Sequence, residues 1–179
     1  DSPLAATGTF NLGSGWDSTG GTLRAIDSEI DFTGLTEAMK ISSGSAYGPF
    51  SLELRGSSVY KGSWPNFGAY NASSHLASTA TNRIVVADTA KMMLNSNQGG
   101  TQLRYCYGVN ELAVEGGELS CYFVSMANVG KYGTFAPQST FRQTGGKVTV
   151  TAGTFSQYEN DWYAFNAGDC DADNASVSA

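Results

Sequence analysis

Short segments that alternate apolar and polar residues run along most of the chain, and clusters of Gly, Ser, Asn and Asp separate them. Such alternation is typical of β-strands with one buried face, and the clusters are typical of turns. About ten strands in a chain of this size predict an all-β fold of antiparallel strands, a β-sandwich or jelly roll or else a closed barrel. The predicted strands cover residues 7–13, 21–32, 49–56, 57–64, 82–88, 101–109, 111–115, 118–127, 146–155 and 160–168.

Two segments predict short helices that connect strands. In VADTAKMMLNSN, residues 86–97, Asp88 is a suitable N-cap and the Asn-rich stretch after Leu94 a suitable end. GLTEAMKISSG, residues 34–44, has room for one or two helical turns. No linker-like segment interrupts the 179 residues, so residues 1–179 are expected to form a single β domain.

The chain carries few charges for its hydrophobic content. Hydrophobic residues make up 41% and charged residues 15%, whereas about a quarter of the residues in an ordinary globular domain are charged. A surface built from Ser, Thr, Asn, Gln and Gly favours an exported protein, either extracellular or on a virion surface. The start DSPLAATG, without Met, indicates either a processed or a trimmed N-terminus.

Charge and hydropathy disfavour two classes of partner. The net charge is −6 and no run of basic residues occurs, so nucleic-acid binding is not expected. No stretch approaches the roughly eighteen apolar residues that a membrane-spanning helix needs.

Residues 111–123, ELAVEGGELSCYF, predict a β-hairpin that turns at Gly116 and Gly117. Glu115 would then face Glu118 across the turn. One face of this hairpin would carry Leu112, Val114, Leu119, Cys121 and Phe123, which are its apolar residues at alternate positions.

The three cysteines favour one disulfide, between Cys106 and Cys121. The hairpin does not place Cys106 opposite Cys121, so this bridge needs Cys106 on an adjacent third strand or a broad loop in place of the tight turn. Cys170 is the other candidate partner, and three reduced, buried cysteines are an alternative. A zinc site is disfavoured because no Cys-x-x-Cys occurs and His75 is the only histidine.

An acidic cluster lies close to the C-terminus. Asp169, Asp171 and Asp173 alternate in DCDADN, so in an extended segment their carboxylates would point the same way. Calcium is the one cofactor that this arrangement suggests, and otherwise none is expected. A solvated acidic tail is the alternative interpretation.

Several aromatic residues lie in or beside loop-like sequence. They are candidates for a binding surface that stacks on sugar rings or contacts another subunit. Rings that cover the ends of a sandwich are the structural alternative. The candidate binding residues are Trp16, Trp64, Phe67, Tyr70 and Trp162.

The sequence favours a non-enzymatic structural subunit of an extracellular assembly, such as a filament or pilus or a viral capsid or spike. Copies of the chain would be joined through edge strands and termini. The alternative is a carbohydrate-binding module or lectin with a glycan partner. A β-sandwich glycosidase or lyase is a third class, for which Glu53 and Glu159 would be the first acids to test.

Overall fold

The structure is a computed structural model in which the regular secondary structure of the described residues consists of β-strands. It describes residues 4–8, 10–14, 20–36, 39–43, 49–62, 65–67, 81–94, 101–103, 109–121, 124–126, 138–150, 170–172 and 176–178. The strands of the first half are β1 (Leu4–Gly8), β2 (Asn11–Ser14), β3 (Gly21–Ile26), β4 (Glu29–Leu35), β5 (Met39–Ser43), β6 (Phe50–Arg55), β7 (Val59–Gly62) and β8 (Pro65–Phe67). The remaining strands are β9 (Thr81–Ala87), β10 (Lys91–Leu94), β11 (Thr101–Leu103), β12 (Val109–Cys121), β13 (Val124–Met126), β14 (Gln138–Val150), β15 (Cys170–Ala172) and β16 (Ser176–Ser178).

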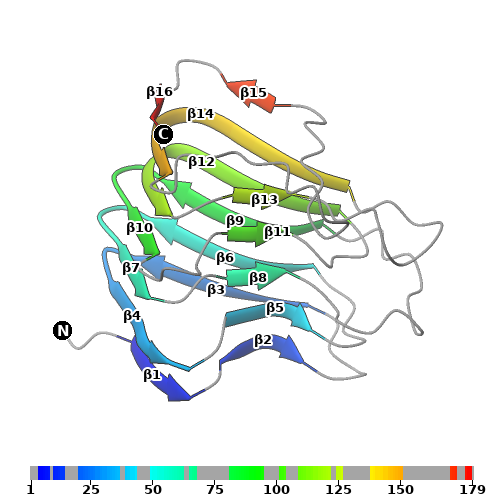
Figure 1. Ribbon diagram of the computed structural model, residues 1–179. Helices are drawn as coiled ribbons and strands as arrows, with labels where there is room; N and C mark the ends of the chain where they lie inside the picture. Colours follow the sequence, from blue (N-terminus) through cyan, green and yellow to red (C-terminus); the bar gives the residue numbers. More distant parts are fainter. Residues whose placement is uncertain are drawn as a thin grey trace.

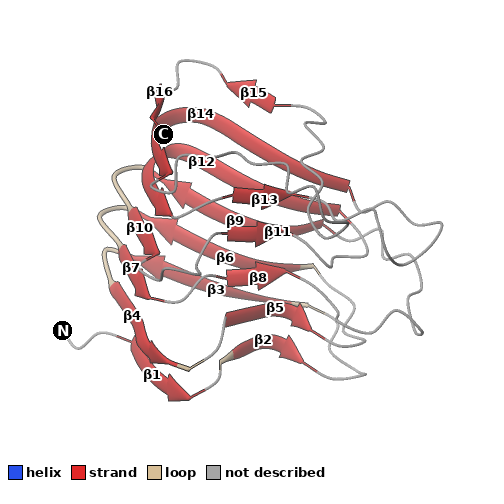
Figure 2. Ribbon diagram, viewed as in Figure 1, coloured by secondary structure: helices blue, strands red, loops and turns tan. Residues whose placement is uncertain are grey.

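The strands form two sheets in which the paired strands run parallel (Figures 1 and 2). The eleven-stranded sheet follows the order β1-β4-β7-β10-β12-β9-β6-β3, and β14 joins β12 to β15 and β16. The five-stranded sheet has the order β13-β11-β8-β5-β2. The larger sheet curls into a half-barrel because β12 and β14 bend midway and pair with different strands before and after the bend.

The bends divide the larger sheet into two walls. Wall A consists of β3, β6, β9, the first halves of β12 and β14, and β15; wall B consists of β1, β4, β7, β10, the second halves of β12 and β14, and β16. Wall C is the five-stranded sheet. The chain passes from wall A to wall B to wall C in turn, as in β3, β4, β5 and then β6, β7, β8, so it winds as a stack of coils. Each coil lies against the coil before it and the coil after it.

The all-β prediction is confirmed, but the predicted antiparallel sandwich, jelly roll or closed barrel is wrong. Parallel sheets usually have both faces buried and show near-continuous apolar runs, so alternation favoured antiparallel pairing. Here each wall buries only its inner face, as the alternating burial of β6 and β10 shows. A curled parallel sheet therefore produces the same alternation. The prediction of one domain stays a prediction.

Apolar residues of successive coils stack in rows inside the walls. Leu23, Leu52, Ile84, Leu112 and Phe141 are mutually in register on wall A, and they are 28 to 32 residues apart in the sequence. On wall B the corresponding row contains Ile30, Tyr60, Met92, Leu119 and Val148. These residues belong to one core cluster, with Leu23 at its partly buried margin. The core is thus a column that runs through the stack.

The Gly116–Gly117 segment is a corner and not a hairpin turn. Strand β12 continues through it, and Gly116 has φ 101°. Glu115 pairs with Ala87 on wall A, and Glu118 pairs with Lys91 on wall B, so the two glutamates do not face each other. The predicted inner face is nevertheless confirmed for Leu112, Val114, Leu119 and Cys121, which all lie in the core. Phe123 lies outside the described residues.

Neither helix predicted from the sequence forms within the described residues. Lys91–Leu94 is strand β10, and its burial alternates, with Met92 and Leu94 inside and Lys91 and Met93 outside. Asp88 is not an N-cap: it has φ 59° at a corner, where its Oδ2 accepts a hydrogen bond from the Gly56 backbone N–H at 2.8 Å. Met39–Ser43, in the second segment, is strand β5.

Each corner between walls A and B holds a residue with positive φ. An extended strand can change direction sharply at a residue with positive φ. Glycine and aspartate adopt a positive φ more readily than most residues. Asp27 also links two corners, because its Oδ1 accepts hydrogen bonds from Ser57 N–H at 2.8 Å and Ser57 Oγ–H at 3.0 Å. These bonds lower the pKa of the Asp27 carboxyl. The corner residues with positive φ are Asp27, Gly56, Asp88, Gly116 and Gly146.

Candidate functional site

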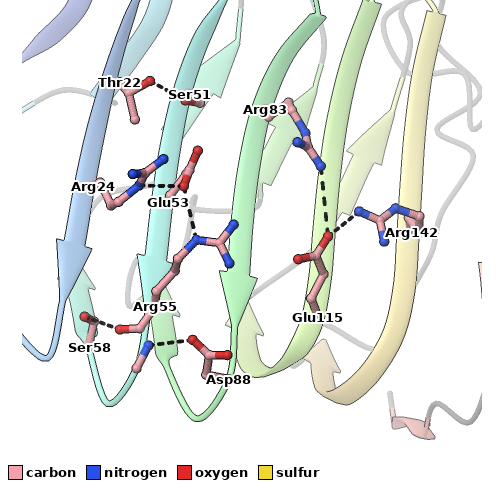
Figure 3. A network of polar contacts seen from close by, with 11 residues as sticks. Thr22, Arg24, Ser51, Glu53, Arg55, Ser58, Arg83, Asp88, Glu115 and Arg142 are labelled. Atoms are coloured by element: carbon pink, nitrogen blue, oxygen red, sulfur yellow. Dashed lines mark hydrogen bonds and ion pairs between the residues drawn. The ribbon is translucent and has the colours of Figure 1, made fainter.

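The outer face of wall A carries most of the chain's arginines. Four of the five arginines lie on it, one each on β3, β6, β9 and β14 (Figure 3). They occupy positions that alternate with core residues, so the period of the strand places them outside. These four residues are Arg24, Arg55, Arg83 and Arg142.

The first cluster on this face joins β3 to β6. Arg24 Nε donates to Glu53 Oε2 at 2.8 Å, and Arg55 Nε donates to the same oxygen at 3.2 Å. The Arg24 hydrogen bond is the main cause that holds the pKa of the Glu53 carboxyl below its usual value, and Arg55 adds to it. Thr22 and Ser51 share a hydrogen bond of 2.9 Å between the same two strands.

The second cluster joins β9, β12 and β14. Glu111 accepts from Arg83 Nε at 2.6 Å and from Arg142 Nε at 2.8 Å, one arginine at each carboxylate oxygen. Arg142 also donates to Glu115. Burial opposes ionisation of Glu111, but the hydrogen bonds and charges of both arginines outweigh it and lower the pKa of its carboxyl.

Small apolar residues lie between the two clusters on the same outer face. Val85, Ala87 and Ala113 are buried and form a cluster separate from the main core. Figure 3 shows the Arg55 guanidinium extending from β6 toward β9, the strand that carries Val85 and Ala87. Long side chains can lie over small ones, so this face is a cross-linked surface in which ion pairs tie successive coils together.

The chemistry of this face suits charge recognition better than proton transfer. A general acid needs a raised pKa, and the arginines lower the pKa values of Glu53 and Glu111. Within the described ranges, no group of three or more His, Cys, Asp or Glu residues is placed to hold a metal ion. Glu159, the second acid suggested for a glycosidase, lies outside the described residues.

The N-terminal end of the coil stack is the second notable surface. In the described structure β3 pairs only with β6, and β1 pairs only with β4, so each has an open edge. Two of the three exposed large hydrophobic side chains of the described residues lie on these strands, Ile26 at 56% exposure and Leu4 at 45%. The hydrophobic residues that only partly enter the core also lie at this end: Ala6 in β1, Phe10 just before β2, Leu23 in β3 and Leu35 in β4.

The aromatic residues predicted to bind a ligand are not brought together by the described structure. Phe67 is the last residue of β8, of which the backbone alone is described. Trp16, Trp64, Tyr70 and Trp162 lie outside the described residues. The aromatic binding surface therefore stays a prediction.

The predicted calcium and disulfide sites are described only in part. Asp171 lies in β15, in register with Arg142, while Asp169 and Asp173 fall outside the described residues. Cys121 is buried at the end of β12, and Cys106 falls outside the described residues. Both sites stay predictions.

The arginine face was not predicted from the sequence. Its signal was a charged residue at an outward position of successive strands, as in TLRAI, SLELR and NRIVV. Reading it required the 28- to 32-residue spacing that brings these strands side by side. An antiparallel arrangement of neighbouring strands gives these charges no common face.

Comparison with protein-family models, with curated proteins and with solved structures finds no match to this chain. Among the described residues, no helix is long and apolar enough to span a membrane. Function is therefore inferred from the geometry of the coils, the charges on wall A and the open strand edges.

Replacing Glu111 by glutamine is expected to lower the free energy of unfolding by about 1–2 kcal/mol at pH 7, because its side chain is only 16% exposed and serves two arginines. The lowered pKa stabilises the fold above the unfolded-state value near 4.3, and this contribution disappears as pH falls through the folded-state pKa. Urea unfolding at pH 7 and below pH 4 measures both effects. Glu29→Gln is the control: Glu29 is 39% exposed and bound to one lysine, and the change should have little effect. Equal losses in the two variants at pH 7 would contradict the network.

Proposed function

We propose that this chain is a structural subunit of an extracellular assembly in which copies join through the ends of their coil stacks. The observation that carries the proposal is the open edge at each end of the described larger sheet, β1 and β3 at one end and β15 and β16 at the other. Figure 1 shows these strands at opposite ends of the stack. The backbone N–H and C=O groups of an edge strand can pair with a strand of another chain.

The two ends differ, which favours open growth over a closed pair. Contact between unlike ends is heterologous, and repeated heterologous contacts produce filaments unless the rotation closes a ring. The partly buried hydrophobic residues at the N-terminal end would gain burial in such a contact. Filament growth is therefore the form of assembly that the stack favours.

The charge pattern and composition also support a structural role. The carboxylates on wall A are bound to arginines and hold coils together. The low share of charged residues, 15%, fits an exported protein with a neutral hydrophilic surface. The glycan-binding alternative rests on aromatic side chains outside the described residues and stays a prediction.

Light scattering of the purified protein is expected to show particles that grow with concentration, and negative-stain microscopy should show them as filaments. Ile26→Lys should reduce this growth because it sets a charge beside the open edge of β3. Met93→Lys is the matched control, since Met93 is also exposed but lies on β10 in the middle of wall B. A species of 18.8 kDa at every concentration would contradict the proposal.

A further inference from the structure

We infer that the strand added at the open edge of β3 is β15 of a second copy, in the register that sets Asp171 of that copy beside Arg24. This inference rests on the proposed assembly and names its partner strand. It follows from the residue row on wall A in which both positions occur.

The row runs across wall A from one end of the stack to the other. Arg24 pairs with Glu53, and the row continues through Val85 and Ala113 to Arg142 and Asp171. It begins with a cation and ends with an acid. When β15 of one copy pairs with β3 of the next, Arg142 and Asp171 of the first copy would be followed in the row by Arg24 and Glu53 of the second. Neighbouring positions in this row would then carry opposite charges.

The neighbouring positions also match. Asp171 lies between Cys170 and Ala172, and Arg24 lies between Leu23 and Ala25. In the same register, Cys170 of the second copy would lie beside Leu23, and Ala172 beside Ala25. Leu23 is only partly buried and lies beside the open edge, so an added strand in this register would cover it.

Charge disfavours the symmetric alternative. If two N-terminal ends met with their β3 strands antiparallel and paired about residue 24, Arg24 would face Arg24 of the second copy. Like charges directly opposite each other on neighbouring strands are destabilising. Arg24 is 52% exposed and shares Glu53 with Arg55, so its guanidinium is accessible to an additional acidic partner.

Wall B limits the contact to wall A. The edge of β4 that a continuing stack would use is already occupied by β1. The β16 strand of the incoming copy would fall at this position, and it is shorter than β1, with three residues against five. We therefore expect β16 to leave its place at the contact, while β15 stays between its own β14 and the β3 strand of the next copy.

The test reverses the two charges separately and then combines the proteins. Arg24→Glu alone and Asp171→Arg alone should each weaken association roughly tenfold, because each sets like charges side by side at every contact. An equimolar mixture of the two variants should assemble like the wild type, since every contact between unlike variants joins opposite charges. Sedimentation velocity over a concentration series measures all three samples.

Arg55→Glu is the matched control, because Arg55 also binds Glu53 but lies on β6, away from the open edge. It should associate like the wild type. If circular dichroism shows that Arg24→Glu or Asp171→Arg is destabilised, the neutral variants Arg24→Gln and Asp171→Asn are used instead. Each neutral variant is expected to weaken association about threefold. Hydrogen exchange in residues 21–26 should slow on assembly.

The outcomes separate the register from the proposed function. If the wild type assembles and Arg24→Glu and Asp171→Arg each associate as strongly as the wild type, the pairing of β15 with β3 is overturned. The proposed assembly itself is then unaffected. The same conclusion follows if folded variants fail to recover on mixing. Wild-type protein that stays a monomer overturns both proposals.

Discussion

Gly62→Ala is expected to lower the free energy of unfolding by about 3–5 kcal/mol, because a side chain there meets backbone that cannot move aside. Gly62 ends β7 with φ 127°, and an added Cβ would lie 2.3 Å from the carbonyl carbon and 2.5 Å from the carbonyl oxygen of Phe32 on the adjacent strand β4. Urea unfolding followed by circular dichroism measures the loss.

Gly8→Ala separates the clash from the backbone strain. Gly8 has φ 85°, but an added Cβ would have no atom within 4 Å. Its replacement should cost about 1–2 kcal/mol, the strain of a side chain at positive φ alone. Equal losses at both positions would mean that β4 and β7 are not as close as the parallel pairing requires.

Phe32→Ala is expected to cost about 3–5 kcal/mol, the usual range for removing a buried phenylalanine. Phe32 is fully buried, and its ring centroid lies 4.8 Å from that of Phe10 and 5.8 Å from that of Tyr60, the latter edge-on at 79°. The lost packing around these rings and the cavity left in the core column both contribute. The same urea unfolding assay measures the effect.

Ile26→Ala is the control for Phe32→Ala. Ile26 is a large hydrophobic residue on the same end of the stack, but it is exposed on the outside of β3. Its truncation should change the free energy of unfolding by less than about 0.5 kcal/mol. A comparable loss in both variants would contradict the assignment of inner and outer faces.

The faces of the strands could be predicted from the sequence, but their neighbours could not. Alternation placed Leu112, Val114, Leu119 and Cys121 on the inner face, as observed. Alternation does not report strand direction, because a parallel sheet with one exposed face shows the same two-residue period as an antiparallel sheet. The Gly116–Gly117 pair permits either a tight hairpin or a corner, and the positive φ of Gly116 serves both.

The sequence feature that distinguishes a corner from a hairpin is a repeat of the corner positions about every thirty residues. Each corner between walls A and B has Asp or Gly at positive φ, at Asp27, Gly56, Asp88, Gly116 and Gly146, and these positions repeat with the coil. The residues between them differ so much that no motif stands out. Asp88 fits a helix N-cap in the sequence because aspartate suits both an N-cap and a corner at positive φ.

The candidate site was less predictable than the fold. Glu53 is a candidate catalytic acid in the sequence, yet the two arginines that bind it lie 29 residues before it and two residues after it. Only the stacking of β3 on β6 reveals that these charges neutralise one another. Open edges likewise depend on which strand lacks a neighbour, and single-strand patterns do not contain that information.

The coil stack separates the width of the molecule from its length. A coil touches only the coils before and after it, so duplicating or deleting a unit of 28 to 32 residues preserves every type of contact. Each such unit would change the length by about 4.8 Å, the spacing of neighbouring strands, and leave the cross-section unchanged. Duplication or loss of one coil in the gene would therefore change the length of the stack by a constant increment, without any change in the packing of its interior.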